Sequence, residues 1–205
     1  EDISIRVRST DGTGLDPVFA LGVATVVMAL GLAIYAPLAN SINARLNQGT
    51  FLFSLQFGAT VFANVLLQLP LGRLSDTYGR RPFLVWGFVL LLPATLIQGF
   101  LTSSFLMIVA RFIQGIAVAA VFAPSLALAG DLAGDGESGS TLSLLTMGFG
   151  LGIAFGTLFS GILVGFGFAT PFVVATVLSA GGLILVYTQV GEPTNVEQPT
   201  PTPGD

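Results

Sequence analysis

The sequence predicts an all-α membrane protein with six transmembrane helices. The mean hydropathy is +0.86, and charged residues make up 9% of the 205 residues, against roughly a quarter in soluble domains. Uncharged runs of span length follow one another along the whole chain, so a cleaved signal peptide does not account for them. About 20 apolar residues cross a bilayer as a helix, whereas a membrane strand takes about ten residues of alternating polarity. The long runs therefore favour helices.

The spans are expected within a six-helix transmembrane domain, residues 18–190, which follows a cytoplasmic tail at residues 1–17. Pro37 lies near the end of the first span, where a transmembrane helix tolerates it. Polar or glycine-rich breaks separate the spans: NSINARLNQG, GRLSDTYGRRP, TSS, GDLAGDGESGS and GFGFATP. The expected spans are residues 18–39, 50–71, 83–101, 105–129, 141–164 and 169–190.

The last two spans divide residues 138–191, an uncharged stretch that is too long for one span. The segment 191–205 is rich in proline and threonine, and we expect it to be a disordered cytoplasmic linker or tail.

Arginines near the span ends predict the orientation, because they favour the cytoplasmic side. If the N-terminus is cytoplasmic, five arginines lie inside and only Arg45 lies outside. The inner arginines are Arg6, Arg8, Arg73, Arg80 and Arg81. Six spans return the C-terminus to the cytoplasm, so we expect a multi-pass plasma-membrane protein with both termini inside.

Missing residue types exclude several classes of function. The chain has no cysteine and no histidine, which excludes disulfides, thiolate chemistry and a Ser–His intramembrane protease. The spans carry no carboxylate for an aspartyl mechanism, and the sequence has no phosphate-binding loop or metal-ligand cluster. We therefore expect no enzyme, catalytic residue, metal, cofactor or nucleic-acid partner.

All seven basic residues are arginines, beside eleven acidic residues. The absence of lysine together with acidic loops indicates a halophile, in which arginine and carboxylates dominate the wetted surface. The alternative is chance, because the wetted part of this chain is small.

The segment GRLSDTYGRRP, residues 72–82, places four charges between two uncharged runs. Gly72 and Gly79 permit close approach and unusual backbone dihedrals, and Pro82 can begin a helix, where its missing N–H costs nothing. Asp76 is the expected partner of the neighbouring arginines. From the residues alone, the segment is a tight inner turn, and orientation by its arginines is the simplest explanation of its charge.

The pattern G-x-L-S-D-x-x-G-R-R-P closely resembles the signature loop between the second and third helices of the major facilitator superfamily, with Thr77 in place of the family's usual basic residue. RFIQG, residues 111–115, resembles the family's R-x-x-Q-G element. GLGIAFGTLFSG, residues 150–161, resembles the glycine-rich element of its drug antiporters, with Thr157 where proline is usual. Asp131 matches an acidic residue often found after the fourth helix. The resemblance implies a major-facilitator-type half bundle.

What the resemblance implies is secondary active transport of a small solute by alternating access, with antiporter efflux as the family-level expectation. The loop charges would form a cytoplasmic latch, which fastens the two halves in the outward-open state and loosens when the protein turns inward. The implied gating charge cluster comprises Gly72, Arg73, Asp76, Gly79, Arg80, Arg81 and Asp131.

Polar residues within or at the ends of the spans are candidates for a substrate or coupling cavity. Arg111 lies in the fourth span, where an arginine is costly and should face a cavity or a partner, unless it snorkels to the outer surface. Gln114 shares its helix face. For the amides the alternative is hydrogen bonding between helices, and for Tyr35 a place in the interfacial belt. The candidates are Arg111, Gln114, Tyr35, Asn40, Asn64 and Gln68.

Three glycines in the fifth span, Gly148, Gly152 and Gly156, recur every four residues and predict a smooth ridge for close helix packing. Because the spans carry no carboxylate, any coupling to protons or sodium ions would use the loop acids, Arg111 or residues outside this chain.

A six-helix half is expected to have a second half as its partner, besides the lipid bilayer and the small-molecule solute. The second half could be a missing C-terminal part of the same chain, a separate chain or another copy in a homodimer. The alternative function is a non-transporting membrane assembly factor or sensor built on the same half-fold.

Overall fold

The computed structural model describes residues 15–133 and 138–191. Within them, six helices are long and apolar enough to cross a membrane, which confirms the predicted fold class. The helices are α1 (Pro17–Ala33), η1 (Ala36–Leu38), α2 (Ala39–Leu46), α3 (Thr50–Tyr78), α4 (Arg80–Gln98), α5 (Ser104–Leu132), α6 (Ser138–Leu163), η2 (Val164–Phe166) and α7 (Thr170–Gln189). The expected N-terminal tail and C-terminal linker lie, apart from residues 15–17 and Gly191, outside the described residues.

Local sequence signals fix where several helices begin. Asp16 caps α1, because its carboxylate accepts hydrogen bonds from the backbone N–H groups of Val18 at 2.8 Å and Phe19 at 3.2 Å. Pro17 occupies the first helical position, where its missing N–H is not needed. The Ser103 side chain caps α5 in the same way through the N–H of Leu106.

Two of the predicted connections are wrong, because both are largely helical. In place of a polar loop, residues 40–49 contain most of α2, whose Ile42 and Leu46 are buried one turn apart. In place of a tight turn at residues 72–82, α3 continues to Tyr78 and α4 begins at Arg80. Only Gly79 interrupts the helix there, with a φ of 96° that a glycine adopts readily.

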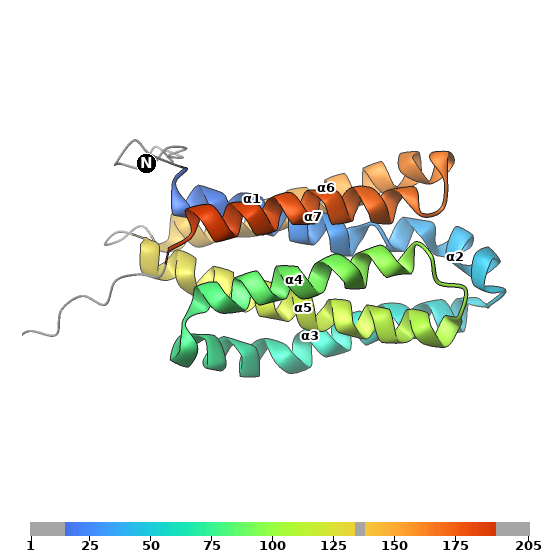
Figure 1. The fold of residues 1–205 in the computed structure, drawn as a ribbon, viewed down its shortest axis with the longest axis horizontal. Coiled ribbons are helices and arrows are strands. Elements are labelled where there is room, and N and C mark those ends of the chain that lie inside the picture. Colours follow the sequence, from blue (N-terminus) through green and yellow to red (C-terminus); the bar gives the residue numbers. More distant parts are fainter. Residues whose placement is uncertain (1–14, 134–137, 192–205) are drawn as a thin grey trace, which may run out of the picture.

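The helices form two layers of three (Figure 1). One layer contains α1, α6 and α7, and the other contains α3, α4 and α5; contacts of α1 with α5 and of α4 with α7 join them. The Gly79 turn, the start of α1 and the ends of α5 and α7 lie at one end of the bundle (Figure 1). A hydrogen bond from Leu15 N to the Gln189 side chain, 2.8 Å long, ties the two ends of the described chain together there.

The first and fourth spans, α1 and α5, are the most buried, whereas α3 and α6 expose most of their apolar surface. Close packing centres on glycines. Gly148, Gly152 and Gly156 of α6 all face the α1 backbone: a Cβ on Gly156 would lie 2.6 Å from the Leu30 carbonyl oxygen, and one on Gly152 would overlap that of Val26. Gly115 of α5 lies against Thr60 of α3 in the same manner. These helices can approach closely only because the side chain is absent.

We predict that Gly152→Ala destabilises the bundle by about 1–3 kcal/mol, because the added methyl group must displace the α1 backbone. Gly150→Ala is the matched control: Gly150 lies on the same helix, and a Cβ added to it would meet no other atom within 4 Å. Thermal unfolding in one detergent would compare both variants with the wild type. Equal melting temperatures for the two variants would contradict this packing.

Candidate functional site

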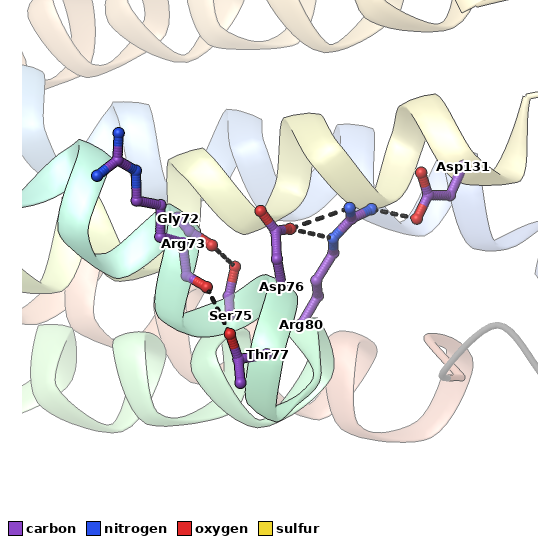
Figure 2. A network of polar contacts seen from close by, with 7 residues as sticks. All are labelled: Gly72, Arg73, Ser75, Asp76, Thr77, Arg80 and Asp131. Carbon is purple, nitrogen blue, oxygen red and sulfur yellow. Dashed lines mark hydrogen bonds and ion pairs between the residues drawn. The ribbon is translucent and has the colours of Figure 1, made fainter. Parts of the chain in front are cut away.

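A charge cluster joins three helices at the end of the bundle that contains Gly79. Arg80, the first residue of α4, lies between Asp76 in the last turn of α3 and Asp131 in the last turn of α5 (Figure 2). Its Nη2 lies 3.0 Å from Asp76 Oδ1 and its Nε donates to the same oxygen at 3.1 Å. Its Nη1 donates to Asp131 Oδ2. One guanidinium thus connects two carboxylates that are 55 residues apart in the sequence.

Each charged residue of this cluster lies at the end of its helix where the helix dipole disfavours a charge of that sign. Arg80 is at the N-terminus of α4, where a cation is unfavourable, and both carboxylates are at helix C-termini, where anions are unfavourable. Mutual pairing offsets these penalties. The Arg80 side chain is 18% exposed, whereas the Asp76 and Asp131 side chains are 54% and 51% exposed. The cation is therefore enclosed, and the two carboxylates keep faces open to further partners.

Three other residues of the expected gating cluster lie apart from this triad, whereas Gly79 forms the turn directly before Arg80. Arg81 donates from Nη2 to the backbone oxygen of Tyr187 at 2.7 Å, and its guanidinium lies 5.3 Å from the centre of that tyrosine ring, so it ties α4 to the end of α7. Arg73 is exposed and points away from Asp76 (Figure 2). Gly72 faces α5 at ordinary contact distance.

Arg111 lies two turns into α5 and is 1% exposed, so the alternative in which it snorkels to the surface is wrong. Its Nη1 donates to Gln114 Oε1 at 2.5 Å. The guanidinium carbon lies 4.0 Å from the centre of the Tyr35 ring and 5.9 Å from that of Phe57. Cation–π attraction of this kind contributes about 0.5–2 kcal/mol.

Gln114 uses all its hydrogen-bonding groups inside the bundle. Its Oε1 accepts from Arg111 and, at 3.0 Å, from Gln98 Nε2. Its Nε2 donates to the Gly31 carbonyl at 3.2 Å and to Thr95 Oγ1 at 3.1 Å. The side chain therefore links α5 to both α1 and α4, which is the helix-to-helix role considered as the alternative for the amides.

Tyr35 is fully buried, so a place in an interfacial belt is wrong for it. Its hydroxyl donates to Gln56 Oε1 at 2.6 Å, and its ring stacks on Phe53 at 5.2 Å between centres. Gln48 also donates to Gln56 and thereby connects the loop after α2 to the network. Tyr35 lies in a short break between α1 and η1, and the break places its side chain over Arg111.

Three expected cavity residues lie away from Arg111. Asn40 is exposed on α2, and Asn64 and Gln68 follow Thr60 by one and two turns along α3, toward the Gly79 end. Thr60, whose hydroxyl donates to the Arg111 carbonyl at 2.9 Å, marks the level of Arg111 on that helix.

The sequence interpretation missed four buried polar residues of this region. Gln56 and Thr60 on α3 are four residues apart within an uncharged run, a spacing that indicates one polar helix face. Thr95 and Gln98 on α4 are three residues apart, which is the same kind of signal.

Comparisons with known proteins agree with this architecture. The family model described as Major Facilitator Superfamily matches residues 21–204. An uncharacterized transporter of Buchnera aphidicola is 28% identical over 160 residues, which are 77% of this chain and 40% of the relative. An uncharacterized MFS-type transporter of Methanocaldococcus jannaschii is 26% identical over 171 residues, 83% of this chain and 44% of the relative. An MFS-type transporter of Metarhizium majus is 30% identical over 146 residues, 71% of this chain and 28% of the relative.

The chain thus spans less than half the length of these curated relatives. The family match nevertheless covers nearly all of the described residues, and it includes the charge cluster, Arg111 and the α6 glycines. Together with six helices of membrane-spanning length, it places this multi-pass membrane protein in the major facilitator superfamily.

Proposed function

We propose that this chain acts as the N-terminal half of a secondary active transporter, which moves a small solute across the plasma membrane by alternating access. The observation that carries the proposal is the separation of two polar sites along one six-helix bundle. A charge cluster lies at the Gly79 end, and a buried polar network surrounds Arg111 nearer the other end. A latch at one end and a polar site deeper in the bundle are the two parts that alternating access needs.

The distribution of arginine supports a cytoplasmic location for the Gly79 end. Among the described residues, Arg73, Arg80 and Arg81 lie at that end and Arg45 lies at the opposite one. Arg6 and Arg8 lie outside the described residues. Both termini would then be cytoplasmic.

The latch would work because its ion pairs are weak and depend on solvation. Pairs with half-exposed carboxylates contribute about 0.2–1 kcal/mol, and less when water surrounds them. Asp76 and Asp131 already share Arg80, and their open faces can accept hydrogen bonds from a second half when it closes over them. A closed, drier cluster is stronger than an open, wet one, which gives two states of similar free energy.

The exposed apolar surfaces of α3 and α6 support a second half as the partner. The largest exposed side chains on these two helices include Phe51, Phe62, Val65, Leu69, Met147, Leu158 and Ile162. Lipid covers part of such a surface, and a second six-helix body, as the rest of a longer chain, a separate chain or another copy, covers the rest. Antiporter efflux is the proposed mode of transport, supported by the resemblance of residues 150–161 to the glycine-rich element of drug antiporters.

We predict that Asp76→Asn lowers the rate of solute transport about fivefold at equal expression, because a lost pair worth about 1 kcal/mol shifts the closing equilibrium by that factor. Transport across the membrane of cells or proteoliposomes would be measured with the complete transporter. Thr77→Ala is the control, since the Thr77 hydroxyl donates to the Arg73 carbonyl of its own helix. Transport by Asp76→Asn at the wild-type rate would refute the latch.

The orientation has a separate test, which uses the absence of native cysteine. Thr77→Cys and Asn47→Cys place single thiols on exposed positions at opposite ends of the bundle. We predict that a membrane-impermeant maleimide labels Asn47→Cys in intact cells, but labels Thr77→Cys only after permeabilisation. The reverse pattern would invert the proposed topology.

A further inference from the structure

Arg111 is a buried cation that uses only part of its hydrogen-bonding capacity. Nη1 donates to Gln114, whereas Nε and Nη2 have no hydrogen-bond partner in the described part of the protein. Both nitrogens are fully buried. The N–H of Nε and one N–H of Nη2 point the same way along one edge of the planar guanidinium, and that edge matches the two oxygens of a carboxylate or phosphate.

No carboxylate of the described residues lies near this edge. Those residues contain three carboxylates, Asp16, Asp76 and Asp131, and all three lie at the Gly79 end of the bundle. Asp131 is on the same helix as Arg111 but 20 residues away, which is about 30 Å along the axis. Within the described chain the charge of Arg111 is therefore balanced by no anion.

Aromatic contacts and one hydrogen bond stabilise this charge without using the Nε–Nη2 edge. An arginine inside a membrane helix is costly, and the rings of Tyr35 and Phe57 and the Oε1 of Gln114 each offset part of that cost. None of them accepts a hydrogen bond from Nε or Nη2, so these two donors call for an anion bound side-on.

We propose that Arg111 binds the anionic group, a carboxylate or a phosphate, of the solute that the protein transports. This inference rests on the transport function proposed above and assigns the solute to a chemical class. The Nε–Nη2 edge holds the two oxygens, and the rings of Tyr35 and Phe57 lie against the apolar part of the solute.

The surroundings of Arg111 favour a small solute over a side chain of a second half. Arg111 is 1% exposed, so a protein side chain would have to reach past α3 into the bundle. A solute reaches the guanidinium most directly from the side that Phe57 covers. Phe57 is 42% exposed, and Tyr35 lies where the helix is broken between Ala33 and Ala36.

The test is ligand-dependent thermal unfolding of the complete protein in lipid nanodiscs, with benzoate and benzamide as a matched pair and inorganic phosphate as a second anion. Benzoate and benzamide share one ring and differ in charge. We expect benzoate, phosphate or both to raise the melting temperature by a few degrees at about ten times the dissociation constant, and benzamide to leave it unchanged.

Three variants assign the effect to Arg111. Arg111→Gln should weaken anion binding about tenfold or more, because a charge-assisted pair of hydrogen bonds is lost, and Arg111→Lys should keep the preference for benzoate over benzamide. Arg45→Gln is the control and should keep the wild-type shift, because Arg45 is an exposed arginine whose Nε bonds to the Leu101 carbonyl. The comparison of the two ligands on the wild type remains decisive if Arg111→Gln does not fold.

Equal shifts with benzoate and benzamide, no shift with either anion, or an undiminished anion shift in Arg111→Gln would each overturn the inference. The absence of a shift with either anion is also the result expected if a carboxylate of a second half is already bound to the guanidinium. Binding is measured without turnover and on the wild type, so the benzoate shift tests the anion site whatever Asp76→Asn does to transport. Failure of the latch and failure of the anion site are therefore distinguishable.

Discussion

The position of charge along the bundle is the constraint on which the rest of this structure depends. Eight charged residues occur in the described chain, and six of them lie at the Gly79 end, one at the other end and one inside. Hydrocarbon does not solvate charge, so residues at the ends can pair loosely in water while the one inside must be enclosed. The half-exposed Asp76–Arg80–Asp131 triad and the fully covered Arg111 are these two outcomes within one molecule.

Small residues allow this enclosure. Gly152 and Gly156 bring α6 against α1, and Gly115 brings α5 against α3, so each of the two most buried helices is closely covered by a neighbour. Gln114 of α5 then reaches the Gly31 carbonyl of α1. Larger side chains would separate the helices and leave these polar groups unsatisfied in an apolar medium, at a cost of several kcal/mol each.

Much of the architecture could be predicted from the sequence, because hydropathy and helix length decide the number of spans, and spacing indicates the glycine ridge. The helical structure of residues 40–49 and 72–78 could not be predicted in this way. Hydropathy indicates where the chain leaves the membrane, but a helix can continue beyond that point into water. The residues predict that Asp76 pairs with the neighbouring arginines, and the family resemblance implies that Asp131 joins them; the structure brings Asp76, Arg80 and Asp131 together. The bond from Arg81 to the Tyr187 carbonyl carries no sequence signal, since any residue at 187 has a carbonyl. The network of Gln56, Thr95 and Gln98 depends on which helix faces meet, which spacing alone leaves open.

The first span is interrupted between α1, which ends at Ala33, and η1, which begins at Ala36, so it consists of two helical segments. The first segment, α1, packs against the α6 glycines. Tyr35, within the interruption, and Gln48, after α2, both donate hydrogen bonds to Gln56 of α3. At the junction, the Ser160 hydroxyl donates to the Ile34 carbonyl at 2.6 Å, so the interrupted backbone exposes no bare oxygen to the apolar interior. A relative displacement of α3 and α6 would therefore act on the residues between α1 and η1, beside Arg111.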